Sequence, residues 1–550
     1  MHPVEPRGEP ARADLVVLGA GVVGLATAYA AARRGLSVLL LDRADGPVQG
    51  TSFANGAQLS YAYTDAMAGP STWRQLPAML FGRNGPFRTR WSADPDFWRW
   101  GLAFLRQTGS ARLRANTLAT LQLALESRSA LHALLQRHPI AFDHAVSGKL
   151  HVYHDAAALH GAASMIALKQ PFGVEQHLLD ARQAIAAEPA LATMPGLAGA
   201  VYSPQEEAGD PFRFGVGLLQ VLQQQYGLQA RFGVDIRRVV RQDDGWCLQP
   251  HAGAALQARR LVVCNGIDGA ALLRPLGVRM PLMTIKGYSF TAPCGPRAPT
   301  ASITDTSRKL VFCRLGERMR VAGLADLNHW DPRPHPERMA QLVAMARASM
   351  PEAVDYAHIE SDWAGLRPVT PWSSPEIRAI GAGLVCNLGH GMLGWTLAMG
   401  SGERAVSLAL ALAQCWRCRE RSPATPASTR IGPCACARLK SSTRSTPPAR
   451  SVPRHARCTS PSRRSARSCT TPSTSWASSC SSWCAGGWSP PTRRTRCSSR
   501  SRTSTTACCR CRRRSPTSAT SAAGISAWRW CPRSASTWCR RRSPSTGAST

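Results

Sequence analysis

A glycine-rich turn near the start of the chain constrains its fold more than any other feature. Residues 14–42 read DLVVLGAGVVGLATAYAAARRGLSVLLLD: an apolar stretch, the spacing Gly19-x-Gly21-x-x-Gly24, a helical pattern and a second apolar stretch. In dinucleotide-binding folds the first glycine permits a tight turn, the second lets the backbone approach the pyrophosphate, and the third lets the helix pack on the strand. We therefore predict a nucleotide-binding α/β domain. The alternative is a glycine-rich turn in an unrelated α/β domain.

The end of this segment indicates which nucleotide is bound. The helix that follows the turn offers free N–H groups and the positive end of its dipole to the phosphates. Asp42 ends the second apolar stretch, 23 residues past the first glycine. Its carboxylate can accept hydrogen bonds from both hydroxyls of an unphosphorylated ribose. This pattern favours FAD or NAD over NADP.

Composition divides the chain into two unlike parts. Strand-like apolar runs alternate with helical patterns from about residue 14 to residue 412, which indicates an α/β architecture. From Cys415 onward there are 27 basic residues and one acidic residue, so the first 414 residues carry a net charge of +8 and the last 136 carry +26. Fourteen of the 19 cysteines also lie after position 414.

The segment 413–550 is predicted to be a disordered basic tail. Phe, Tyr, Asn and Asp are absent after Cys415, and neither a helical nor a strand period is present there. Ordinary disordered tails are poor in Cys and Trp, and this one is rich in both. We interpret it as the product of a frameshift in a GC-rich coding region. The alternative is an ordinary basic tail.

Metal and nucleic-acid functions of the tail are disfavoured. Cys415 and Cys418 have CxxC spacing, but no second pair completes a zinc site, so no metal is expected. Arginines interleaved with Trp would bind nucleic acid or acidic lipid without selectivity, and no selected nucleic-acid partner is expected. Residues 1–13 lack an apolar signal core, and Arg33 and Arg34 interrupt the apolar run at 15–41. We expect a cytoplasmic protein.

Six further motifs, together with the fingerprint, carry a family resemblance. Over about residues 14–402 the chain resembles the FAD-dependent D-amino acid oxidase superfamily, and within it the bacterial D-amino acid dehydrogenase small subunits. The motifs are TSFANGAQLS at 51–60, AGDP at 208–211, KGYS at 286–289, RVAG at 320–323, WAGLRP at 363–368 and GHGMLGWT at 389–396. At 372–375 the chain reads WSSP, where the family usually has an Asp-Gly turn.

The resemblance implies a discontinuous domain arrangement. A Rossmann-like FAD-binding domain is expected to comprise residues 14–85, 200–282 and 360–412. An interleaved α+β substrate domain is expected to comprise residues 86–199 and 283–359. The family-specific turn at 389–396 would lead from a strand into a helix, whose N-terminus would stabilise the negative charge of a reduced flavin. Expected cofactor contacts are Gly19, Gly21, Val22, Val23, Gly24, Asp42, Arg43, Thr51, Ser52, Asn55, Gly56, Gln58, Gly266, Gly389, Gly391, Leu393, Gly394 and Thr396.

Three residues are catalytic candidates. Arg367 matches the arginine that holds the substrate carboxylate in the family, and its planar fork suits bidentate pairing with a carboxylate. His390 is expected to orient the flavin or line the pocket, rather than to act as a general base. Tyr288 is expected either to pack near the substrate or to be structural.

The implied reaction is oxidative deamination of a D-amino acid to a 2-oxo acid and ammonia. The hydride would pass to flavin N5 and the electrons to a quinone or similar acceptor. The enzymatic alternatives are an oxygen-using amino acid or imino acid oxidase and a D-hydroxyproline dehydrogenase. A different class comprises a nucleic-acid-binding or membrane-binding module in the tail, or an inactive product of a disrupted gene.

The stretch Pro95–Arg106 bears on a membrane partner. It is aromatic, apolar and basic, so it is expected to be either a core-facing helix or an interfacial helix that contacts a membrane. Because the related dehydrogenases pass electrons to the respiratory chain, peripheral contact with the inner membrane is implied.

Overall fold

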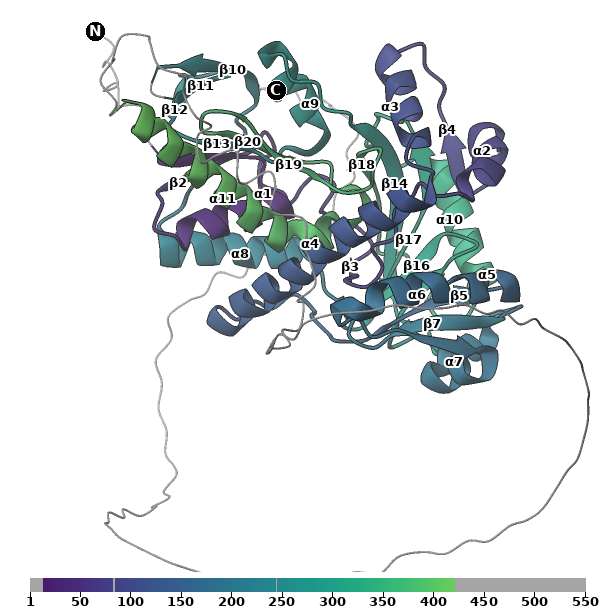
Figure 1. Cartoon of the computed structure of the whole chain (residues 1–550). Helices are drawn as coiled ribbons and strands as arrows, with labels where there is room; N and C mark the ends of the chain where they lie inside the picture. Colours follow the sequence, from purple (N-terminus) through teal and green to yellow (C-terminus); the bar gives the residue numbers. More distant parts are fainter. Residues whose placement is uncertain (1–12, 83–84, 244, 421–550) are drawn as a thin grey trace, which may run out of the picture. The chain divides into compact units, whose positions relative to one another are not determined.

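The fingerprint segment forms the centre of a six-stranded sheet in the computed structural model, which describes residues 13–420 except 83, 84 and 244 (Figure 1). Side chains of consecutive residues in β1 point to opposite faces, and both faces are covered. Leu15 and Val17 pack into the core on the helix side, whereas Val16 and Leu18 pack into the core on the other side. The strand order is β19-β20-β13-β1-β2-β9, parallel except for β19. The strands are β1 Leu15–Leu18, β2 Val38–Leu41, β9 Gln229–Arg231, β13 Leu261–Val263, β19 Glu376–Gly381 and β20 Leu384–Leu388.

Helices and a small sheet cover the two faces of this sheet. Helix α1 is almost entirely buried between the sheet and helix α11. Small residues of both helices lie at the contact between them. A Cβ on Gly402 would lie 2.8 Å from the backbone of Ala26, so a side chain there would push the helices apart. The helical layer comprises α1 Val22–Ala32, α8 Pro211–Tyr226 and α11 Gly394–Glu420. The opposite layer comprises β10 Ile236–Gln242, β11 Gly245–Pro250, β12 Leu256–Ala258 and α9 Gly269–Leu273.

A nine-stranded mixed sheet forms the second half of the described structure. Its order is β18-β14-β17-β16-β15-β5-β7-β6, and β4 pairs with β17 off this path. The strands are β4 Phe87–Thr89, β5 Lys149–Tyr153, β6 His177–Asp180, β7 Gly199–Ser203, β14 Met283–Pro293, β15 Ser302–Asp305, β16 Leu310–Leu315, β17 Arg318–Leu327 and β18 Ser361–Val369. The other elements are the β3 Gln58–Leu59 and β8 Glu207–Ala208 pair and the helices α2 Thr72–Phe81, α3 Pro95–Leu105, α4 Ser110–Arg137, α5 Ala156–Gly161, α6 Ala163–Lys169, α7 Ala181–Ala187 and α10 Pro336–Ser349.

The α/β fold class is confirmed, and two segments lie elsewhere than their expected domain. Strand β18 was expected in the FAD-binding domain, but it pairs with β14 at the edge of the nine-stranded sheet. Helix α4 was expected in the substrate domain, but its buried Leu123 and Leu131 belong to the core that α1 and α11 share. An edge strand joins whichever edge matches it, and a helix packs wherever its apolar stripe is covered. Sequence position alone does not decide either placement.

The C-terminal tail is helical at its start. Helix α11 continues to Glu420, so residues 413–420, which were expected to be disordered, extend it. A formed helix propagates easily because each added residue gains a backbone hydrogen bond. Residues 421–550, and with them the frameshift interpretation, lie outside the described residues. Among the described helices, none combines the length and apolar character needed to cross a bilayer.

Candidate flavin and substrate site

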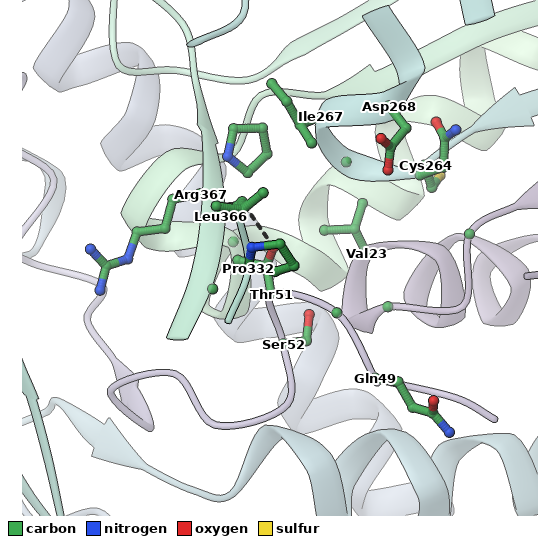
Figure 2. Close-up of a pocket in the computed structure, with 18 of the residues that line it drawn as sticks. Val23, Gln49, Thr51, Ser52, Cys264, Ile267, Asp268, Pro332, Leu366 and Arg367 are labelled. Carbon is green, nitrogen blue, oxygen red and sulfur yellow. Dashed lines mark hydrogen bonds between the residues drawn. The ribbon is translucent and has the colours of Figure 1, made fainter. Parts of the chain in front are cut away.

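A cavity of about 870 Å³ lies at the carboxyl ends of the central parallel strands. The last residues of β1, β2, β13 and β20 lead into its wall, and β18 closes the side toward the second sheet. In Figure 2 Arg367 extends away at one end, whereas Gln49 and Asp268 lie toward the other. Open α/β sheets bind their ligands at this edge, where helix N-termini and loops converge.

The first and third glycines of the fingerprint turn have no room for side chains. Gly19 has φ +105°, and a Cβ there would lie 2.8 Å from backbone atoms of Cys264 and Asn265. A Cβ on Gly24 would lie 1.7 Å from the carbonyl oxygen of Gly19. Gly21 caps α1 without a side-chain hydrogen bond, so the N-terminus of this helix is open to the cavity. The Val22 N–H donates to Ser52 Oγ at 3.4 Å, and the other N–H groups of the first turn, together with the helix dipole, suit a pyrophosphate.

The acid at the end of β2 lies beside the turn. One carboxylate oxygen of Asp42 accepts a hydrogen bond from the backbone N–H of Ala20, and the other accepts one from Ala44 at 2.9 Å. Arg43 pairs with Asp268 at 3.0 Å across this end of the cavity. Burial raises the pKa of Asp268. The position of Asp42 next to the open helix N-terminus suits a ribose adjoining the pyrophosphate.

Four buried polar atoms in the cavity wall have no hydrogen-bond partner within the described part of the chain. They are Asn265 Oδ1, Asn387 Oδ1, His390 Nε2 and Trp395 Nε1. Buried polar atoms are rarely left unpaired, so this wall is built for a ligand with its own donors and acceptors. The elongated cavity, the open helix N-terminus and these atoms fit FAD. The fingerprint turn and Asp42 would hold the nucleotide part of FAD. Asn387, His390 and Trp395 would hold the flavin part.

The loop at 51–60 is fixed by contacts to the nine-stranded sheet and to helix α11. Thr51 Oγ1 donates a hydrogen bond to the carbonyl oxygen of Leu366 at 2.7 Å (Figure 2). Thr396 Oγ1 accepts one from the backbone of Ser60 at 2.9 Å. Buried Arg320 pairs with Asp210 at 3.4 Å and reaches the Asn55 carbonyl oxygen at 3.5 Å. Sequence reasoning singled out the motif containing Arg320 but assigned no role to its side chain. In the structure it positions this loop.

Arg367 is a partly buried cation in the cavity wall, with no anionic partner among the described residues. Its guanidinium lies against the backbone of β14, since a Cβ on Gly287 would lie 2.0 Å from Nη2. Burial alone lowers the pKa of Arg367 to about 10, which leaves it protonated at neutral pH. Among the described residues, no carboxylate lies within ion-pair distance of it. An unpaired buried charge is costly, so an anionic ligand would bind strongly here.

His390 lies at the other side of the cavity wall, after β20. It is 5% exposed, and its backbone bridges Val369 at the end of β18. Burial lowers the pKa of His390 to about 3. The imidazole is therefore neutral at physiological pH, which suits orientation of a ligand. A neutral imidazole with so low a pKa is a poor acceptor of a substrate proton.

We expect His390 to make stability depend on pH. Its folded-state pKa of about 3 is below the ordinary value of 6.5, so the unfolded chain binds the proton more readily between these values. Stability therefore rises with pH across this window and is lost as the pH falls. Near pH 5 the loss is on the order of 2 kcal/mol. Thermal unfolding of flavin-loaded wild type and His390→Gln from about pH 7 to pH 4.5 tests this. Parallel losses of Tm in both proteins would contradict it.

The structure brings most of the predicted site residues together. Fifteen of them line the cavity: Gly19, Gly21, Val22, Val23, Asp42, Arg43, Thr51, Ser52, Asn55, Gly266, Arg367, Gly389, His390, Gly391 and Gly394. Six do not line it. They are Gly24, Gly56, Gln58, Leu393, Thr396 and Tyr288.

Tyr288 belongs to a different neighbourhood. Its hydroxyl donates to Asp326 Oδ2 at 2.8 Å, and Arg338 binds the same carboxylate. Burial raises the pKa of Tyr288, so the phenol stays protonated. The side chain is 1% exposed within the core of the nine-stranded sheet. The sequence left two roles open for Tyr288, packing near the substrate or a structural role. This position supports the structural role.

Several wall residues gave no signal in the sequence. Trp330 and Pro332 come from the loop after β17, and Gln49 lies just before the expected loop. They are remote in sequence from the motifs, and only the fold brings them to the cavity.

The segment 372–375, which reads WSSP, departs from the Asp-Gly turn that is usual in the family. Ser373 has φ +68°, a conformation that favours glycine, and its Oγ accepts from the backbone of Met67 at 2.9 Å. Serine thus occupies a backbone conformation that favours glycine.

Comparisons with known proteins agree with this geometry. A family model described as FAD dependent oxidoreductase (DAO) matches residues 14–408. D-amino acid dehydrogenase 2 of Ralstonia nicotianae is 40% identical over 406 residues, covering 70% of this chain and 94% of the relative. D-amino acid dehydrogenase of Paramagnetospirillum magneticum is 38% identical over 399 residues, covering 72% and 94%.

Solved structures show the same fold at low identity. Glycine oxidase from Geobacillus kaustophilus has a TM-score of 0.58 and 18% identity, covering 73% of this chain and 95% of that one. L-proline dehydrogenase from P. horikoshii has a TM-score of 0.57 and 15% identity, covering 74% and 95%. The fingerprint, the cavity and the family match over most of the described residues lead to one conclusion: the chain belongs to the DAO family of FAD-dependent oxidoreductases.

Proposed function

We propose that this chain is a D-amino acid dehydrogenase, which oxidises D-amino acids to 2-oxo acids and ammonia and passes the electrons to a quinone or similar acceptor. The guanidinium of Arg367 carries this proposal. It is partly buried, has no ion-pair partner among the described residues, and offers a carboxylate site in the same cavity as the flavin-binding wall. The names of the relatives from Ralstonia nicotianae and Paramagnetospirillum magneticum support the D-amino acid as substrate.

The residues of the cavity have distinct parts in this reaction. Arg367 would hold the substrate carboxylate in a bidentate pair and so fix the orientation of Cα. Bound FAD supplies the acceptor for the hydride that leaves Cα. The substrate ammonium gives one proton to solvent so that the neutral amine can form the imine as the Cα–H bond breaks, and water then hydrolyses the imino acid to the 2-oxo acid and ammonia. Neutral His390 would orient ligand groups by hydrogen bonding rather than take the substrate proton.

A panel of D- and L-amino acids with an artificial electron acceptor tests the proposal on the flavin-loaded full chain. Dye reduction with D-amino acids, little with their L-enantiomers and little peroxide in air is the expected result. Stoichiometric peroxide would instead identify an oxidase. Turnover confined to D-hydroxyproline would identify an imino acid dehydrogenase. A yellow protein that oxidises no D-amino acid would overturn the proposal.

The proposed electron acceptor bears on where in the cell this enzyme would act. Quinones dissolve in the bilayer, so a cytoplasmic enzyme that reduces a quinone must contact the inner membrane. We therefore include peripheral contact with the inner membrane in the proposed function.

A further inference from the structure

A cluster of large apolar side chains projects into solvent from α2, α3 and the segment between them. We call Trp73, Phe81, Trp91, Trp98 and Leu102 the aromatic patch; each is at least 45% exposed. The ring centroids of Phe81 and Trp91 are 5.8 Å apart, as are those of Trp91 and Trp98. The three rings therefore form a continuous exposed row. Contiguous exposed apolar surface of this kind marks an interaction site.

The exposed side chains of the aromatic patch are not the ones that α3 packs against the core. Helix α3 buries Phe97, Trp100 and Phe104, which face the interior together with Ile285 and Val369. Trp98 and Leu102 are one helical turn apart on the opposite side of α3 and are about half exposed. The helix is thus apolar on both sides, and the rings that Trp98 contacts, those of Trp91 and Phe97, leave it about half exposed. In Figure 1, α2, β4 and α3 lie together at one edge of the structure.

Arginines surround the aromatic patch. Exposed Arg74, Arg90 and Arg106 have no carboxylate within ion-pair distance among the described residues. The acids of this surface are already engaged. Asp96 pairs with Arg99 and Arg274 at 2.9 and 3.1 Å, and Asp94 caps α3. The surface therefore presents aromatic rings and free positive charge. Interfacial tryptophans with flanking arginines are the combination that binds an anionic bilayer surface.

The aromatic patch adjoins the mouth of the cavity. The carbonyl oxygen of Arg90 accepts a hydrogen bond from Asn328 Nδ2 at 2.9 Å. Asn328 Oδ1 in turn accepts from the indole N–H of Trp330 at 2.8 Å. Trp330 lines the cavity and is half exposed. Two hydrogen bonds thus connect the patch to the rim of the cavity, so a bilayer seated on the patch would lie beside the opening.

We propose that the aromatic patch docks this protein on a bilayer that carries anionic phospholipids. The rings would lie at headgroup depth, and Arg74, Arg90 and Arg106 would pair with lipid phosphates. The proposed function supplies only the purpose of this docking, which is to bring the cavity close to an electron acceptor dissolved in the bilayer. Lipid binding is measured without turnover, so failure of one proposal is distinguishable from failure of the other.

Vesicle co-sedimentation of the full chain tests the aromatic contribution. Vesicles of phosphatidylcholine with phosphatidylglycerol are used at about 0.5 M NaCl, where screening suppresses binding by the basic residues after Cys415. The variant combines Trp91→Ser, Trp98→Ser and Leu102→Ser and leaves every charge in place. It should bind at least about tenfold more weakly than wild type. The matched control, Phe172→Ser, removes an exposed aromatic ring outside the patch and should bind like wild type.

A second variant tests the contribution of the arginines to lipid binding. It also keeps the proposal testable if the triple variant does not fold. Arg74→Gln with Arg106→Gln, assayed at about 0.15 M NaCl, should lower affinity for the anionic vesicles about tenfold. Its affinity for pure phosphatidylcholine vesicles should not change. Wild-type affinity of both folded variants for the anionic vesicles would overturn the proposal. So would sedimentation velocity showing that the triple variant dissociates a lipid-free oligomer, since the patch would then join copies of the chain.

Discussion

Replacing Arg367 with methionine is expected to lower kcat/KM for D-amino acids about a thousandfold, or about 4 kcal/mol, mainly through a higher KM. The substrate carboxylate would enter the cavity without its bidentate partner. The same change is expected to raise the Tm of the substrate-free protein, because it removes a partly buried guanidinium that has no counter-charge among the described residues. Steady-state kinetics and thermal unfolding measure the two effects. Few substitutions in an enzyme should lower activity and raise stability together.

Two further variants separate charge from geometry. Arg367→Lys keeps the charge but loses the planar fork, so an intermediate loss is expected. Gly287→Ala leaves the arginine in place, but a Cβ there would lie 2.0 to 2.3 Å from its guanidinium atoms and must displace them. It should raise KM by about tenfold, with a smaller effect on kcat. A wild-type KM in Arg367→Met would place the substrate carboxylate elsewhere.

Replacing Gly24 with alanine is expected to abolish FAD retention. The added Cβ would lie 1.7 Å from the carbonyl oxygen of Gly19, and both atoms belong to rigid backbone. The N-terminus of α1 must therefore move away from the turn that binds the pyrophosphate. Such overpacking costs about 1–3 kcal/mol or more, in addition to the lost cofactor contacts. The ratio of flavin to protein absorbance after purification, together with Tm, measures the effect.

The matched control for Gly24→Ala is Gly101→Ala in α3. Gly101 is also a helical glycine, but no atom lies within 4 Å of a Cβ built there. Alanine is the better helix former, so this variant should gain about 0.5–1 kcal/mol and keep its flavin. A normal flavin ratio and Tm in Gly24→Ala would show that the turn and helix relax without cost. The steric explanation of the fingerprint would then be wrong for this chain.

The sequence predicted the parts of the site that depend on local geometry. A turn that must bring a helix onto a strand requires glycine at fixed spacing, so Gly19, Gly21 and Gly24 were readable without coordinates. The Gly389–Gly394 turn was readable for the same reason. Tyr288 shows the limit of this approach. A motif gave its position on a strand, but not whether its hydroxyl faces a cavity or Asp326.

Long-range placement explains the rest of what the sequence left undecided. Trp330 reaches the cavity only because β17 pairs with β14 and the loop after it folds back over the opening. Strand β18 carries Arg367 at the edge of the nine-stranded sheet, where a sequence-based domain boundary had assigned it to the other domain. Strand pairing is set by register and burial across distant segments, which a linear pattern does not contain.

The sequence by itself determined the nucleotide fold, because a glycine-rich turn between a strand and a helix depends on residue types at short spacing. Its resemblance to the D-amino acid oxidase superfamily, carried by several separated motifs, implied FAD and the role of Arg367. Only the tertiary structure decided that Arg367 is desolvated and unpaired, that His390 is neutral, and that aromatic side chains of α2 and α3 remain uncovered beside the cavity. Burial and pairing are properties of contacts between distant residues. They exist only once the chain has folded.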